Sequence, residues 1–103
     1  MEEVRVTRWP SPEVPTEAGL LDLMSRQGLD GYAWSNAPND VYAPHSHTYY
    51  KILYVVRGSI TFQLIQLGAW HRLNPGDRLD LPAGITHAAH VGEEGVVCLE
   101  ARC

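Results

Sequence analysis

Cysteine is scarce in this chain of 103 residues, which has only Cys98 and Cys103. Two cysteines are too few for a disulfide scaffold. If residues 96–102 form a strand, five residues at ~3.3 Å each separate the pair by about 16 Å, whereas disulfide-bonded Cα atoms lie about 6 Å apart. We therefore expect two free thiols, with Cys98 buried in the apolar run of residues 96–99.

Long apolar runs and clusters of positive charge are also missing. No stretch approaches the roughly 18 apolar residues of a membrane-spanning helix. Met1 leads into Glu2 and Glu3 rather than into the basic and apolar regions of a signal peptide. The net charge of −4 and the dispersed arginines leave no basic stripe. We therefore expect a cytoplasmic protein with no membrane and no nucleic acid as a direct partner.

The composition is that of one folded domain. Hydrophobic residues make up 45% of the chain and charged residues 19%, which suits a single core. One segment has helical spacing: Thr16 is a good N-cap, an apolar stripe follows over residues 20–24, and Gly28 ends the pattern. We expect residues 1–28 to form an N-terminal arm with this short helix.

From residue 29 onward, short apolar segments alternate with turn-forming residues. The segments are rich in Val, Ile, Tyr and Leu, as strands are. The predicted turns lie at residues 37–40, 57–58, 67–68, 74–77, 82–84 and 92–95. This alternation predicts an all-β domain over residues 29–103, a small antiparallel barrel or sandwich.

A predicted strand over residues 45–57 is apolar on both faces. Its odd positions include Leu53 and Val55, and its even positions include Ile52 and Val56. Both faces must be covered, the second one by the N-terminal helix or by another copy of the chain. We predict a homodimer, because closed twofold symmetry is the commonest way for a protein to assemble with itself.

Three of the five histidines form a candidate metal site. His45 and His47 share one face of the predicted strand, about 6 to 7 Å apart at Cα, so both can reach one ion. His87 begins a later strand that can lie beside the first. No motif joins His71 or His90 to this pair, and His90 has the opposite parity to His87. The alternative is a metal-free group of polar side chains, bonded to each other and to water.

Two motifs around these histidines resemble those of the cupins. The first cupin motif, G-x5-H-x-H-x3 or x4-E-x6-G, matches residues 39–58, with Asn39 at the first glycine and Lys51 at the glutamate. The second motif, G-x5-P-x-G-x2-H-x3-N, matches residues 76–91, with Val91 at the asparagine. The resemblance implies a small antiparallel barrel or jelly roll.

The same resemblance implies a metal inside the barrel, bound by a carboxylate and by His45, His47 and His87. A divalent transition metal is expected, and imidazole ligands do not choose among Zn, Fe, Mn, Ni and Cu.

Lys51, the only lysine of the chain, stands where the cupin motif has its glutamate ligand. A protonated lysine ~5 Å from a divalent metal is repelled by roughly 6 to 7 kcal/mol at an effective dielectric of ~20. We expect the amine to lose its proton or reach toward the barrel mouth, or the metal to be absent or weakly held. Glu100 or Asp80 can point inward as a replacement carboxylate. Lys51→Glu is then expected to tighten metal binding.

Two classes of function fit these residues, and both take a small molecule. The first is a metal-dependent oxygenase or isomerase, in which the metal polarises substrate oxygens and Lys51 pairs with a substrate carboxylate or acts as acid or base. Tyr49 shares the inward parity and is the second catalytic candidate. The alternative is a non-catalytic sensor, since single cupin domains resemble the effector-binding half of certain transcription regulators. A regulator normally needs an attached DNA-binding helix pair, which 103 residues leave no room for unless it is supplied in trans, so we favour the enzyme.

Overall fold

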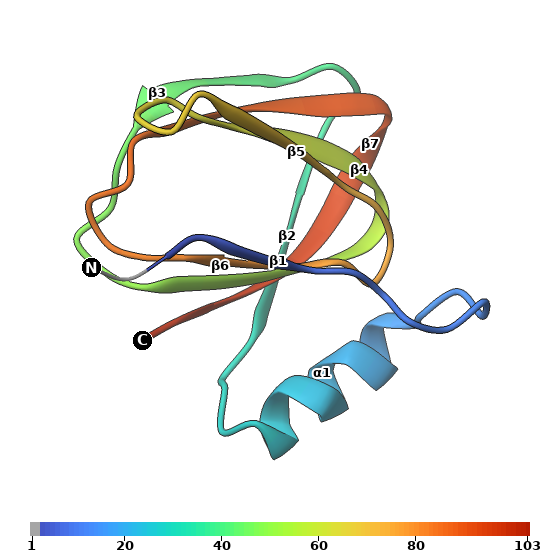
Figure 1. Cartoon of the computed structure of the whole chain (residues 1–103). Coiled ribbons are helices and arrows are strands. Elements are labelled where there is room, and N and C mark those ends of the chain that lie inside the picture. Colours follow the sequence, from blue (N-terminus) through green and yellow to red (C-terminus); the bar gives the residue numbers. More distant parts are fainter. Residues whose placement is uncertain (1–2) are drawn as a thin grey trace.

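The computed structural model describes residues 3–103 and contains one helix and a single antiparallel sheet in that range (Figure 1). The elements are β1 (Arg5–Thr7), α1 (Glu17–Arg26), β2 (Tyr32–Asn36), β3 (Val41–His45), β4 (Lys51–Leu64), β5 (Ala69–Leu73), β6 (Arg78–Leu81) and β7 (His87–Arg102). Residues 1 and 2 of the predicted arm lie outside this range, and the boundary at residue 28 stays a prediction.

The sheet rolls around one interior. Its strands follow the order β1-β6-β4-β7-β2, while β3 pairs with β7 and β5 pairs with β4. The two longest strands, β4 and β7, pair from Lys51 opposite Arg102 to Leu64 opposite His87. Figure 1 shows both strands bending so that the sheet folds over on itself. The all-β jelly-roll prediction is therefore confirmed.

The predicted turns at residues 57–58 and 92–95 are wrong, because β4 and β7 continue through both segments. The β4–β7 pairing instead shifts register between Val55 and Arg57 and again between Gly58 and Ile60. Gly58 and Gly95 both have φ of 78°, and a Cβ placed on Gly58 would lie 2.0 Å from the Gly95 carbonyl oxygen. Glycine therefore serves here to bend two paired strands rather than to reverse the chain.

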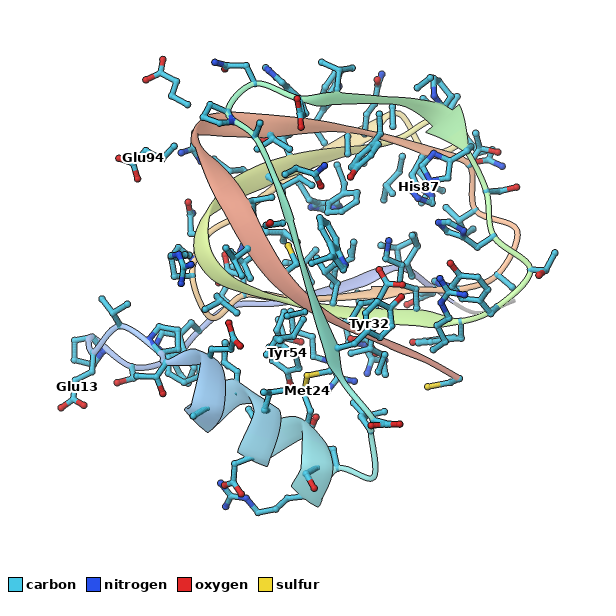
Figure 2. The ribbon with its side chains drawn as sticks, turned by 180° about the vertical axis from the view of Figure 1, so that it is seen from behind. Glu13, Met24, Tyr32, Tyr54, His87 and Glu94 are labelled. Carbon is cyan, nitrogen blue, oxygen red and sulfur yellow. The ribbon has the colours of Figure 1, made fainter. Side chains whose placement is uncertain are left out.

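The predicted helix is confirmed as α1, and it covers the outer face of β4. The Thr16 side chain caps the helix by accepting a hydrogen bond from the Gly19 amide. Leu20 and Met24 pack against a cluster that includes Ile52, Tyr54 and Val56. Met24 and Tyr54 lie together between the helix and the sheet in Figure 2. The face for which we predicted either a helix or a second copy is covered by the helix, and the homodimer stays a prediction.

The predicted strand over residues 45–57 is interrupted. Strand β3 ends at His45, residues 46–50 form a connection, and β4 begins at Lys51. The connection is held by a hydrogen bond from the Gly84 amide to the His47 carbonyl oxygen, at 2.9 Å.

Both cysteines are free and Cys98 is buried, as predicted, while Cys103 is exposed. Over residues 3–103, no helix has the length and apolar character needed to cross a membrane.

Candidate metal centre and ligand cavity

The three predicted histidines meet at one end of the roll. His45 closes β3 and lies opposite His87, the first residue of β7, while His47 follows in the connection to β4. Their candidate ligand nitrogens all lie within 4.8 Å of one another. His87 is only 1% exposed, and Figure 2 shows it pointing into the interior. His90 is exposed and His71 is half-buried, and neither belongs to this group of three histidines.

Backbone carbonyls orient two of these rings. His45 Nδ1 lies 2.9 Å from the Ala43 carbonyl oxygen, and His87 Nδ1 lies 2.9 Å from the Ile85 carbonyl oxygen. A carbonyl only accepts, so Nδ1 carries the proton and Nε2 keeps its lone pair. Within residues 3–103, the buried Nε2 atoms of His47 and His87 have no hydrogen-bond partner. Metal-ligating histidines have this arrangement, so the residues present fit a metal ion.

Burial keeps the imidazoles in the form that binds metals. Burial, helped by the positive charges of His45 and Lys51 and opposed by the hydrogen bond to Ile85, lowers the pKa of His87 to about 4. Burial and the charge of Lys51 also lower the pKa of His47. A ligand histidine must be neutral to coordinate, so no proton has to be displaced from these two rings at neutral pH.

The metal-free protein should therefore lose stability in acid. His87 has an unfolded pKa near 6.5 and a folded pKa of about 4, so below pH 6.5 the unfolded chain binds a proton that the folded chain does not. The His87 contribution to the unfolding free energy should be highest above about pH 7, fall by roughly 2 to 3 kcal/mol toward pH 4, and then level off. Urea unfolding between pH 4 and 8 measures this fall.

His87→Gln is the variant that isolates this effect, since glutamine does not titrate. We expect its stability to vary less over this pH range than that of the wild type, while His90→Gln, changed on the outer surface, keeps the wild-type profile. Parallel profiles for wild type and His87→Gln would contradict the assignment.

Lys51 points inward, where its ammonium meets a carboxylate. Its Nζ lies 3.1 Å from Glu100 Oε1, and both residues are buried. Glu100 also accepts hydrogen bonds from the Tyr32 hydroxyl at 2.5 Å and from Trp34 Nε1 at 3.1 Å. Burial alone would raise the pKa of Glu100, but the Tyr32 hydrogen bond and the Lys51 charge hold it below its usual value. Glu100 compensates the charge of Lys51, so the amine need neither lose its proton nor reach toward the barrel mouth.

Of the two carboxylates expected to replace the missing ligand, only Glu100 lines the cavity. Asp80 instead pairs with Arg78 at 2.7 Å and accepts a hydrogen bond from Tyr50. Glu100 does not join the three-histidine group, because its oxygens face Tyr32, Trp34 and Lys51. The site therefore combines three clustered histidines with a separate, internally neutralised ion pair.

A cavity of about 330 Å³ joins the histidines to this ion pair. Tyr49 stacks on His47 with the ring centroids 4.8 Å apart, and the Arg102 guanidinium carbon lies 4.3 Å from the centre of the Tyr49 ring. The lining is made up of Tyr32, Trp34, Tyr42, His45, His47, Tyr49, Lys51, Phe62, His87, Ala89, Glu100 and Arg102. Sequence reasoning did not single out Arg102, although its even parity with Glu100 on the last strand was an available signal.

A family model described as the AraC-like ligand binding domain matches residues 27–102. The chain belongs to this family. The fold of this AraC-like domain confirms the cupin resemblance of its sequence, since an RmlC-like cupin from Shewanella frigidimarina is similar to it, with a TM-score of 0.61. That pair shares 20% identity, over 72% of this chain and 64% of the other. No curated protein matches the sequence.

Two further solved structures are similar to the AraC-like domain. A DUF861 family protein from Thermotoga maritima has a TM-score of 0.64 and 17% identity, and the match covers 98% of this chain and all of the other. The polyketide cyclase RemF from Streptomyces resistomycificus has a TM-score of 0.60 and 25% identity, over 77% of this chain and 59% of the other. The first match thus spans the whole of the other protein, whereas the second spans about three fifths of it.

Proposed function

We propose that this AraC-like domain binds a divalent transition metal on His45, His47 and His87 and thereby holds a small oxygen-bearing molecule in the cavity. The observation that carries the proposal is the pair of buried Nε2 atoms, on His47 and His87, that lack hydrogen-bond partners within residues 3–103. Buried polar atoms are nearly always bonded, so two imidazole nitrogens that face the same cavity support the binding of a metal ion there. Zn, Fe, Mn, Ni and Cu all accept imidazole ligands.

A metal held there supplies a Lewis acid that polarises a ligand oxygen. Three protein ligands leave coordination positions open for that oxygen, as in catalytic rather than structural sites. The chain's own residues do the rest: Trp34 and Phe62 offer apolar walls, and Tyr49 holds the His47 ring by stacking on it. The Lys51–Glu100 pair keeps a compact ionic group in the wall of the cavity.

Catalysis is a second candidate function, as an isomerase or an oxygenase. It is favoured by the presence of proton-carrying groups, the Tyr49 hydroxyl and the Lys51 ammonium, in the cavity that the histidines line. A similar structure is that of an enzyme, the polyketide cyclase RemF. Conversion of a bound molecule, rather than its release unchanged, would distinguish an enzyme from a sensor.

Zinc titration of the metal-stripped protein tests the proposal. We expect wild type to bind one Zn²⁺ per chain, and His47→Ala and His87→Gln to weaken binding at least ~100-fold, because each removes one of three ligands. Isothermal calorimetry measures the affinities, and Ni²⁺ and Mn²⁺ extend the series.

His90→Ala is the matched control, because it removes an exposed histidine of the same strand as His87. It should bind zinc as wild type does. The metal site would be refuted if wild type bound none of the three metals, or if the two ligand variants bound zinc as tightly as His90→Ala.

A further inference from the structure

The charged groups of the cavity do not balance. Lys51 and Arg102 are cations, and Glu100 is the one carboxylate among the residues that line it. One positive charge is therefore in excess before any metal is bound, and a divalent ion would increase that excess. A cavity with this balance attracts an anion, because the surrounding low-dielectric walls screen charge poorly.

Lys51, the residue expected from sequence to pair with a substrate carboxylate, is already engaged. Its Nζ contacts Glu100 at 3.1 Å, and only 10% of its side chain is exposed. Glu100 in turn is surrounded by the hydroxyl of Tyr32, the indole N–H of Trp34 and the ammonium. A carboxylate has about four acceptor positions, so these donors nearly saturate it and hold the ammonium in the wall.

Arg102 is the cation that remains available. Its side chain is 56% exposed, and its contact with Glu100, through Nε, is longer, at 3.5 Å. A guanidinium has five N–H donors, so the contact with Glu100 through Nε and the hydrogen bond to the Tyr32 hydroxyl leave further N–H groups of the fork for a ligand. The guanidinium carbon lies 4.3 Å from the Tyr49 ring centre and 6.0 Å from that of Tyr32, and these aromatic neighbours restrict the plane of the fork.

The remaining walls describe the body of the ligand. Trp34, Tyr42, Phe62 and Ala89 present apolar surface to the cavity. A volume of about 330 Å³ lies at the lower end of the range for small-molecule pockets. The cavity thus suits a small molecule with an apolar body and one anionic end.

We infer that Arg102 binds the carboxylate of a small aromatic or aliphatic carboxylic acid, whose body fills the cavity between Arg102 and the histidines. A planar carboxylate matches the guanidinium fork with two parallel hydrogen bonds. The inference rests on the proposed function, because the acid would occupy the cavity in which a metal would hold its ligand. It assigns the choice of ligand to a residue outside the histidine cluster.

Benzoate is the probe, titrated by calorimetry into metal-free and zinc-loaded protein. In both forms we expect Arg102→Gln to weaken benzoate binding at least tenfold, Arg102→Lys to weaken it less, and Arg57→Gln, an exposed arginine outside the cavity, to have no effect. Benzamide, a neutral molecule of nearly the same shape, should bind at least tenfold more weakly than benzoate. Inorganic phosphate should not compete with benzoate, since it lacks the apolar body.

Each failure has its own meaning. Benzoate binding that needs zinc but ignores Arg102→Gln would overturn this inference and leave the metal site standing. Arg102-dependent binding by a protein that takes up no zinc would support the inference and refute the metal site. Equal binding of benzamide, effective competition by phosphate, or no benzoate binding in either form would overturn the carboxylate assignment.

Discussion

Glu100→Gln should destabilise the protein by about 3 kcal/mol, which is the loss expected when one partner of a buried ion pair is removed. Glutamine keeps the shape of the side chain but leaves the Lys51 ammonium without its anion. Its amide nitrogen would also take the place of one acceptor oxygen, so that its N–H groups face one of the two donors, Tyr32 or Trp34. Urea unfolding at pH 7 measures the loss. Zinc binding should weaken as well, because an uncompensated lysine then shares the cavity with the metal.

The double variant Lys51→Met/Glu100→Gln is the control for this result. Replacing both charges by neutral groups of similar size often costs little, so the double variant should recover about 2 kcal/mol of the loss. It should also bind zinc more tightly than Glu100→Gln alone. If the two substitutions were instead additive, the ion pair would have no stabilising role and Glu100 would act by another route.

The ion pair also changes the expectation for Lys51→Glu. On sequence alone, a glutamate at this position restores the cupin carboxylate and tightens metal binding. In the structure it would face Glu100 across the position of the lost ammonium, and two adjacent buried carboxylates repel each other. Lys51→Glu should therefore be less stable than Lys51→Met.

Gly58→Ala should cost roughly 3 kcal/mol of stability or more. Gly58 has φ of 78°, which is unfavourable for a side chain, and a Cβ there would lie 2.0 Å from the Gly95 carbonyl oxygen. The obstacle is backbone rather than a flexible side chain, so β4 and β7 must move apart where they bend. Urea unfolding monitored by tryptophan fluorescence measures the effect.

Gly68→Ala separates the two causes. Gly68 also has a positive φ, 61°, but a Cβ on it would meet no atom within 4 Å. Only the conformational cost applies there, so we expect a loss of about 1 kcal/mol. Equal losses at the two positions would show that the close approach of β4 and β7 contributes nothing.

Local sequence signals predicted the parts of the fold that depend on neighbouring residues. The helix followed from Thr16 and the apolar stripe behind it, and the histidine cluster followed from motif spacing. The turn prediction failed at Gly58 and Gly95 because a glycine with positive φ serves a turn and a bulge equally well. The pairing of β4 with β7 decides between them, and that pairing joins residues far apart in the chain.

The partner of Lys51 illustrates the same limit. Sequence parity correctly turned the lysine inward, and it left Glu100 and Asp80 as equal candidates. The choice depends on the register of β4 with β7, in which Lys51 lies opposite Arg102, and on that of β2 with β7, in which Tyr32 lies opposite Glu100. Neither register can be read from local patterns, so the pairing of Lys51 with Glu100 emerges only from the structure.

Because β7 bends, residues from both ends of this one strand line the cavity. His87 begins the strand and Arg102 ends it, yet both line the same cavity because β7 bends. The distance between the histidines and the Arg102 guanidinium therefore depends on the position of the bend in β7. A substitution at this bend, which leaves every residue of the cavity lining unchanged, would alter the length of the molecule that the domain accepts.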